Sequence, residues 1–189
     1  MTRKEQKEMR QKQIMFKALE LFVTKGYTET KISDIAEELG ISVGLLFHYS
    51  ESKEQLYDAL VMMGAEQSKY SEEVEFDDPI DYFTNFINTL FTAAEKQPWV
   101  YQMFMLMQQA RHPSMPENIR QLALSVNKVD FTAEIIRKGQ EYGSIREGDP
   151  TALSFAFWCS IQGIMQLHLI GPEYPIPKAE WITDILRKR

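Results

Sequence analysis

One stretch of the chain, residues 31–53, gathers side chains that are well suited to bind nucleic acid. Ser42, His48 and Tyr49 can form hydrogen bonds with base edges or phosphates, and Lys53 can offer a positive charge at the start of a helix. These residue types are common in proteins. Their value for binding depends on whether the neighbouring sequence holds them on one exposed helix.

The hydrophobic spacing around these residues predicts two short helices joined by a tight turn. The first helix has four apolar residues at i, i+3, i+4 and i+7 spacing: Ile32, Ile35, Ala36 and Leu39. Thr30 is its expected N-cap, Gly40 can take the positive φ that ends it, and Ser42 can cap the next helix. Two helices joined in this way form a helix-turn-helix, whose second helix enters the DNA major groove. The sequence thus predicts this motif over residues 31–50.

Other reactive side chains form no recognisable site. His48, His112 and His168 lie far apart and have no Cys or carboxylate at ligand spacing, so we expect no metal site. No glycine-rich phosphate loop and no nucleophile–base pair occurs, so we expect no catalytic residue, no cofactor and no enzyme activity. The single cysteine, Cys159, is expected in the core. It excludes an internal disulfide and fits a reducing, cytoplasmic location.

Charge is unevenly distributed along the 189 residues. The formal net charge of −6 argues at first against a nucleic-acid partner. However, residues 1–53 carry nine Lys and Arg against eight Asp and Glu, whereas residues 54–189 carry twelve against nineteen. Five basic residues fall within the first twelve positions: Arg3, Lys4, Lys7, Arg10 and Lys12. Local charge decides binding, so this basic N-terminal arm is expected to hold phosphates.

Helical periodicity continues through the rest of the chain, and no sustained period-2 alternation indicates a strand. Helices are expected from about residue 7 to 25 and over 99–111, 117–142 and 151–170, with a break at the acidic connector 72–78. Asp78-Pro79 and Asp149-Pro150 each combine a carboxylate cap with proline at the first helical position. The apolar stretch 155–170 is interrupted by polar residues, which predicts a buried helix and no membrane partner.

The first 65 or so residues resemble the DNA-binding domain of the TetR family of transcriptional regulators. The matching residues are 18–22 and Gly26; Thr30, Ile32, Ile35 and Ala36; Gly40, Ile41 and Ser42; Gly44, Phe47, His48 and Tyr49; and residues 52–54 with Leu56. The C-terminal two-thirds matches only loosely, through residues 143–150 and the helix that contains Gly163. The resemblance implies an all-α protein. Its N-terminal three-helix helix-turn-helix DNA-binding unit, within residues 1–67, is joined by a fourth helix to a C-terminal helical ligand-binding and dimerisation domain, residues 68–189.

The predicted recognition helix departs from the family pattern. Phenylalanine is usual where this chain has Ser50, and tyrosine is usual at Phe47. Ser50 removes an apolar plug and is expected to loosen the helix. With Val43 and Leu45 where polar side chains are common, readout should rely on thymine methyl groups and DNA shape. The Thr30 hydroxyl and Lys53 should contact phosphates. The expected DNA-binding residues are Thr30, Lys31, Ser42, Val43, Gly44, Leu45, Phe47, His48, Tyr49 and Lys53; Phe47 and Tyr49 fit either the core or the DNA face.

The C-terminal helices are rich in methionine and aromatic residues, which favours core packing for any single residue. The resemblance also implies an effector pocket between these helices. Its candidate residues are Phe83, Phe86, Trp99, Tyr101, Met103, Phe104, Met107, Phe155, Trp158, Gln162 and His168. The helix over 151–170 is apolar nearly all round, which is typical of burial on more than one side. Candidate dimer-interface residues are Ala156, Ser160, Gly163, Trp181 and Ile185.

These features together predict a homodimer that binds a palindromic operator in double-stranded DNA and represses transcription. A small apolar or aromatic effector would release it by favouring a conformer with wrongly spaced recognition helices. The alternative is a helical small-molecule-binding protein or enzyme in which the helix-turn-helix is only scaffold. A salt-sensitive gel shift separates the two hypotheses.

Overall fold

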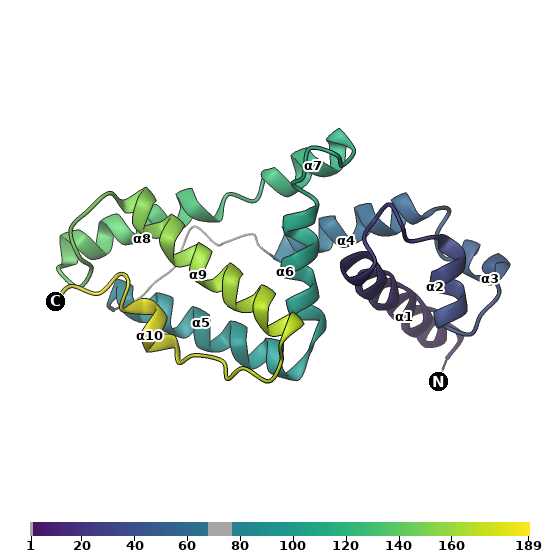
Figure 1. Cartoon of the computed structure of the whole chain (residues 1–189), viewed down its shortest axis with the longest axis horizontal. Helices are drawn as coiled ribbons and strands as arrows, with labels where there is room; N and C mark the ends of the chain where they lie inside the picture. Colours follow the sequence, from purple (N-terminus) through teal and green to yellow (C-terminus); the bar gives the residue numbers. More distant parts are fainter. Residues whose placement is uncertain (1, 68–76) are drawn as a thin grey trace. The chain divides into compact units, whose positions relative to one another are not determined.

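The computed structural model describes residues 2–67 and 77–189, and its regular elements are helices (Figure 1). In chain order these are α1 (Arg3–Thr24), α2 (Ile32–Glu38), α3 (Val43–Phe47), α4 (Lys53–Gln67), α5 (Pro79–Lys96), α6 (Trp99–Gln109), α7 (Glu117–Leu124), α8 (Lys128–Tyr142), α9 (Pro150–Ile170) and α10 (Ala179–Thr183). The all-α prediction is confirmed. Residues 72–76 of the expected acidic connector lie outside the described residues.

By their internal packing the helices fall into two compact units. The first unit comprises Met1–Gln67 and Met105–Ser125, and the second comprises Ser68–Phe104 and Val126–Arg189. The helix α6 therefore contributes its first six residues to the second unit and its last five to the first. In the first unit, α1 packs against α2 and α4, α2 packs against α3, and α4 packs against α7.

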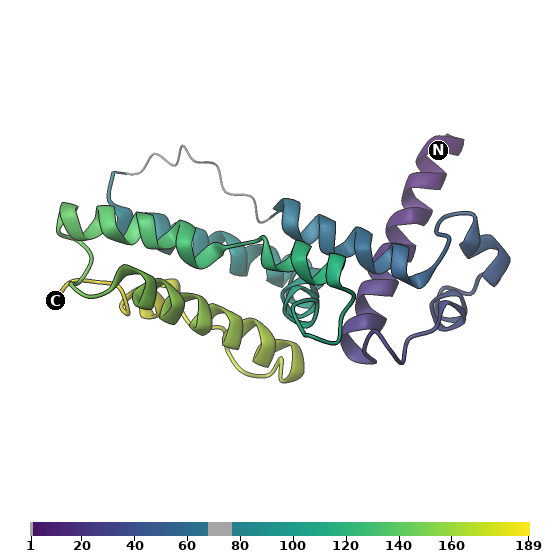
Figure 2. The same cartoon turned by 90° about the horizontal axis from the view of Figure 1, so that it is seen from above.

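Only the C-terminal half of α1 belongs to the core of the first unit. Its buried residues are Ile14, Ala18, Leu19 and Phe22, whereas the residues before Ile14 are exposed or half-buried. Figure 2 shows these first turns extending beyond the other helices of the unit. The helix nevertheless begins at Arg3, because the Thr2 hydroxyl accepts from the Glu5 amide at 3.2 Å and the Glu5 carboxylate accepts from the Thr2 amide at 2.8 Å. The basic segment is therefore helical, although its helix was expected to begin only near residue 7.

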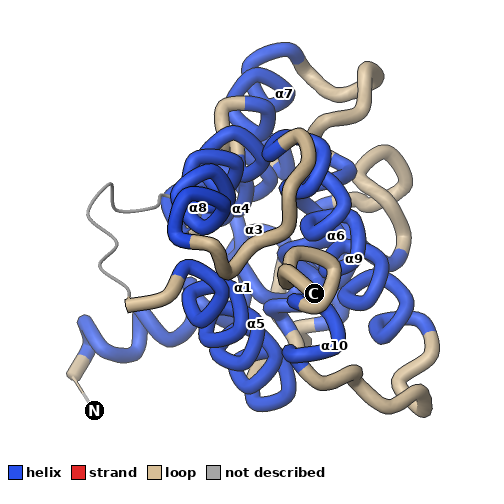
Figure 3. The backbone as a smooth tube through the Cα atoms, turned by 90° about the vertical axis from the view of Figure 1, so that its left-hand side faces the viewer, coloured by secondary structure: helices blue, strands red, loops and turns tan. Residues whose placement is uncertain are grey.

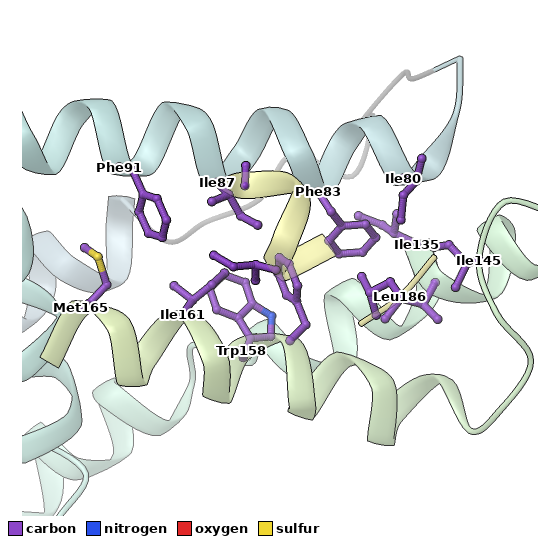
Figure 4. Close-up of a cluster of buried hydrophobic side chains, with 14 of the residues drawn as sticks. Ile80, Phe83, Ile87, Phe91, Ile135, Ile145, Trp158, Ile161, Met165 and Leu186 are labelled. Atoms are coloured by element: carbon purple, nitrogen blue, oxygen red, sulfur yellow. The ribbon is translucent and has the colours of Figure 1, made fainter. Parts of the chain in front are cut away.

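The second unit is built around one hydrophobic core. The helices α5, α8, α9 and α10 surround it, each packing against two of the others, and Figure 3 shows them nearly end-on. Within this cluster, part of which Figure 4 shows, Phe83 of α5 meets Phe157 of α9 edge to face, with ring centroids 4.9 Å apart. By length and composition α9 could cross a membrane. Core helices of folded proteins share that property, and α9 gives Phe157, Trp158 and Ile161 to this core.

Local capping signals located most helix ends correctly. Asp78 caps α5 by accepting from the Ile80 amide at 3.0 Å, and Asp149 caps α9 by accepting from the Ala152 amide at 2.8 Å. The single helix expected over residues 117–142 is wrong, because residues 125–127 divide it into α7 and α8. Asn127 caps α8 by accepting from the Asp130 amide at 3.1 Å.

Candidate functional site

The short helix α3 presents apolar side chains to solvent. Ser42 caps it by accepting from the Leu45 amide at 3.1 Å, and fully buried Leu46 anchors it to the unit. The side chains of Leu45 and Phe47 are 39% and 47% exposed. The question left open for Phe47 is thereby answered, because its ring lies outside the core.

The remaining candidates on and around α3 can supply a few polar contacts. Ser42, Gly44 and His48 are exposed, whereas Val43 and Tyr49 are half-buried. None of the side chains of α3 is charged. This helix therefore offers shape and apolar contact to a groove, and charge for the phosphates has to come from elsewhere.

Lys53 does not offer a free charge. Its ammonium donates to the carbonyl oxygens of Tyr27 at 2.9 Å, Thr28 at 3.3 Å and Thr30 at 3.0 Å. It also lies 4.5 Å from the centroid of the Tyr27 ring. An ammonium has three N–H donors, and all three are used here. In this structure Lys53 ties the start of α4 to the loop between α1 and α2, and the phosphate contact expected of it stays a prediction.

Tyr27 makes further contacts between the same loop and α4. Its hydroxyl donates to the Glu54 carboxylate at 3.1 Å, and its ring packs edge to face on Tyr57 with centroids 4.7 Å apart. Burial, with the nearby Glu54 charge, raises the pKa of Tyr27 to about 12, so the hydroxyl keeps its proton as a donor. Tyr27 was missed from the sequence because its partners lie more than 25 positions away.

Thr30 is also turned inward, contrary to expectation. It is fully buried, and its hydroxyl donates to the carbonyl oxygens of Gly26 at 2.7 Å and Leu21 at 3.2 Å. The N-cap of α2 is Lys31, so the capping role expected of Thr30 is wrong. A hydroxyl that is buried and committed to two carbonyls cannot hold a phosphate.

Ser50, at the position where phenylalanine is usual in the family, forms hydrogen bonds in place of apolar contacts. Its buried hydroxyl lies 2.9 Å from the Ser52 carbonyl and 3.0 Å from the Gln55 amide oxygen. The same Gln55 oxygen accepts from the Glu51 amide at 2.7 Å. Polar contacts therefore join the end of α3 to the start of α4 at this position.

Lys31 remains as an exposed cation close to the turn. Lys25 and Lys17, by contrast, are paired: Lys25 with Asp34, and Lys17 with Glu20 at 2.7 Å. The hydrogen bond from Lys25 is the main reason that the pKa of Asp34 lies below its ordinary value. Lys31 has no ion pair among the described residues, so its charge is available to a phosphate.

Two comparisons decide the family. The sequence model of the bacterial regulatory proteins of the tetR family matches residues 14–60. The HTH-type transcriptional regulator UidR of Escherichia coli is 25% identical over 143 residues, which are 75% of this chain and 71% of UidR. The chain belongs to the TetR family of transcriptional regulators. It is thus a DNA-binding transcription regulator, and its relatives are regulators rather than enzymes.

Solved structures of TetR-like proteins share the fold of this regulator. MbdR from Azoarcus sp. CIB superimposes with a TM-score of 0.73 at 19% identity, over 92% of this chain and 95% of MbdR. AibR in complex with isovaleryl coenzyme A and operator DNA gives a TM-score of 0.68 at 22% identity, over 93% of this chain and 94% of AibR. At these identities the likeness concerns the fold alone.

The candidate pocket residues of the regulator fall into different environments. Phe83, Tyr101, Met103 and Trp158 are buried, whereas Phe86, Trp99, Phe104, Met107, Gln162 and His168 are half-buried. Met107 belongs to the first unit and the others to the second. Trp158 donates from its indole nitrogen to the Thr132 hydroxyl at 2.9 Å, which fixes it in the core. Tyr101 and His168 stand together, with ring centroids 4.9 Å apart.

Phe155, the remaining pocket candidate, lies apart from these side chains. It is 61% exposed, on the side of α9 away from the core, together with exposed Leu167 and Ile170. Cys159 is exposed on this face as well, so its expected burial is wrong.

The dimer-interface candidates on α9 share this outer face. Ala156 is exposed, Ser160 and Gly163 are half-buried, and on the last segment Trp181 is exposed and Ile185 half-buried. Leu167 and Ile170 were missed, although they follow Gly163 at helical intervals. The outer face of α9, defined here by Ala152, Phe155, Ala156, Cys159, Gly163, Leu167 and Ile170, is continuous and uncharged.

Proposed function

We propose that this regulator is a dimeric repressor that releases its operator when a small apolar or aromatic ligand binds the second unit. In this proposal residues 1–67 bind DNA, and residues 68–189 bind the ligand and form the dimer. The observation that carries the proposal is α3, which is capped by Ser42 and exposes Leu45, Phe47 and His48. These side chains suit a major groove, where apolar groups contact thymine methyls.

The outer face of α9 supports dimerisation. A recognition helix of five residues contacts few base pairs, and two copies about 34–36 Å apart would read a palindrome. A two-fold axis pairs the same surface on both copies, so one apolar face per chain suffices. The three large side chains Phe155, Leu167 and Ile170, exposed in the single chain, would be covered in such a pair.

Tyr101 supports a ligand with a polar group. Its hydroxyl is buried and has no hydrogen-bond partner, which costs about 1–3 kcal/mol for a group of this kind. Burial, then the Glu95 charge, raises the pKa of Tyr101, so the hydroxyl keeps its proton. Phe91 and Met165 belong to the same core and face each other at one end of it (Figure 4). An apolar ligand with one hydrogen-bonding group fits this combination.

A gel shift with the DNA upstream of the chain's own gene tests DNA binding. We expect a shifted complex that weakens as salt rises and protects a palindrome in a footprint. The absence of a salt-sensitive complex with any palindrome would contradict the proposal.

Release by a ligand requires a separate experiment. Isovaleryl coenzyme A, which the AibR structure contains, and benzoate, as an aromatic probe, would be added to the preformed complex. We expect a compound that dissociates the complex from wild-type protein to act more weakly on Tyr101→Phe, while both proteins bind DNA equally without it. Equal release of the two proteins by an active compound would exclude Tyr101 as a ligand contact.

A further inference from the structure

The first three turns of α1 separate their charges onto two faces. Arg3, Lys7 and Arg10 stand at i, i+4 and i+7 and therefore share one side of the helix. The other side carries charges of both signs: Lys4, Glu8 and Lys12 at i, i+4 and i+8, with Glu5 beside them. Arg3, Lys7 and Arg10, named here the basic stripe, are thus a purely cationic surface on a segment that packs little against the core.

The basic stripe is also free of internal partners. Its three side chains form no ion pair among the described residues, whereas on the other face Lys4 lies 4.0 Å from Glu8. Figure 2 shows this part of α1 projecting from its unit. Its helix is held by the capping pair Thr2 and Glu5, so the three charges are presented at fixed spacing.

The remaining cations of the DNA-binding region are largely committed. Residues 1–67 contain nine Lys and Arg side chains. Lys17 and Lys25 form ion pairs, and Lys53 donates to three carbonyl oxygens. The helix α3 has no charge at all. Outside the stripe, Lys12 and Lys31 form no ion pair among the described residues. Because phosphate neutralisation supplies most of the salt-dependent affinity for DNA, the chain needs cations beyond these two.

We propose that the start of α1 is a second DNA-contacting element, in which the basic stripe binds backbone phosphates. The proposal rests on the proposed function, namely that the first unit binds DNA. Phosphate contacts carry no sequence information, so the stripe adds affinity and salt dependence without changing the preferred sequence. Recognition is then divided between an uncharged helix, α3, and a cationic one, the start of α1.

Two double variants with equal charge changes test this proposal. Lys7→Ala/Arg10→Ala removes two charges from the stripe, and Lys4→Ala/Lys12→Ala removes two from the other face of the same helix. Alanine favours helix at all four positions, and circular dichroism would check that α1 stays folded. The equilibrium affinity of the full chain for a mixed-sequence duplex would be measured over a series of salt concentrations.

We expect the stripe variant to lose about 0.9 from the slope of log affinity against log salt for each phosphate contact removed. Lys4 and Lys12 belong to the basic arm expected from the sequence, but they share their face with Glu5 and Glu8, so the control pair should keep the wild-type slope. Equal slopes in the two variants, whether changed or unchanged, would overturn the proposal while leaving DNA binding by the wild-type chain intact. A wild-type chain with no salt-dependent affinity would overturn the proposed function as well.

Discussion

The helices α3 and α9 both expose apolar side chains, but they do so on very different scales. In α3 two large side chains, Leu45 and Phe47, are exposed within five residues, and the polar residues Ser42 and His48 flank them. In α9 the apolar face runs from Ala152 to Ile170, nearly the full length of a 21-residue helix that spans about 32 Å at 1.5 Å per residue. The first surface is small with a polar border, and the second is long and uninterrupted by charge.

This difference indicates which partner suits each surface. A short apolar tip with polar neighbours fits a groove in which methyl groups alternate with hydrogen-bonding edges. A long stripe of small and large apolar residues resembles a helix-packing face that lacks its second helix. The comparison therefore supports the proposals that α3 binds DNA and that α9 pairs with a second copy of the chain, and each proposal can be tested separately.

The largest effect is expected for Leu167→Glu on the outer face of α9. The Leu167 side chain is 66% exposed in the single chain, so the variant should fold, but a carboxylate would be buried at a paired interface. We expect a monomer by analytical ultracentrifugation, and the loss of high-affinity operator binding. Cys159, on the same face, should react faster with a maleimide in this variant than in the wild-type protein.

Met62→Glu is the matched control for this substitution. Met62 is a 51% exposed apolar side chain on α4, in the other unit. Its variant should remain a dimer with slow Cys159 labelling. If Leu167→Glu also sediments as a dimer, the apolar face of α9 is not the dimer interface.

Lys53→Ala should show the second-largest effect, and it tests whether Lys53 supports the DNA-binding region or contacts a phosphate itself. Loss of three hydrogen bonds from a charged donor should lower the free energy of unfolding by about 2 kcal/mol. Affinity should fall for all DNA sequences about equally, because α3 loses part of its support. The slope of log affinity against log salt should stay at the wild-type value, since the ammonium contacts carbonyls rather than phosphate.

Lys31→Ala provides the contrast, because Lys31 is exposed and has no ion pair among the described residues. Its thermal midpoint should be unchanged, while the salt slope should fall by about 0.9 if it contacts one phosphate. A reduced salt slope in Lys53→Ala would show that DNA draws the Lys53 ammonium away from its three carbonyls.

Leu45→Ala should have a smaller effect, which depends on sequence. The exposed Leu45 side chain is expected to contact base methyl groups, and a changed base pair in a site typically costs about 1–3 kcal/mol. Competition among operator variants should therefore show a changed order of preference with little change in non-specific affinity. Met62→Ala, at a similarly exposed apolar residue, should leave the order unchanged. The same order in Leu45→Ala would show that α3 does not read bases through this residue.

Local signals made the fold predictable, while long-range contacts decided the site. Asp78 and Asp149 could be assigned as caps because a cap depends only on the next two or three residues. Lys53 could not be assigned, because nothing near it in the sequence indicates the carbonyls of residues 27–30 as its partners. Thr30 was misplaced for the same reason.

The apolar helices show a similar limit. The periodicity of residues 117–142 continues through the break at residues 125–127, so the spacing alone did not separate α7 from α8. In α9 apolar residues occur on both faces, and composition could not say that Phe157 is buried while Phe155 and Cys159 are exposed. Which face of a helix is buried depends on the elements that pack against it, and the helix's own sequence does not identify those elements.

The smallest effect concerns α4 and compares one of its buried polar groups with one of α9. Asp58 on α4 has a buried carboxylate oxygen without a hydrogen-bond partner, whereas the buried Ser154 hydroxyl of α9 donates to the Val129 carbonyl at 2.8 Å. Burial, and then the charge of Glu54, raises the pKa of Asp58 above its ordinary value. Ionised Asp58 therefore opposes folding of the first unit at neutral pH.

Asp58→Asn should remove this cost. Because the folded-state pKa is raised, the carboxyl favours folding below its ordinary pKa, and this contribution is lost as the pH rises through the raised value. At neutral pH the variant should gain on the order of 1 kcal/mol in free energy of unfolding, and the gain should shrink near pH 4, where wild-type Asp58 is increasingly protonated. Thermal melts at the two pH values measure this, with Asp77→Asn as an exposed control. A gain that is the same at both pH values would mean that the carboxylate charge is not its cause, and that Asp58 imposes no electrostatic penalty on the first unit.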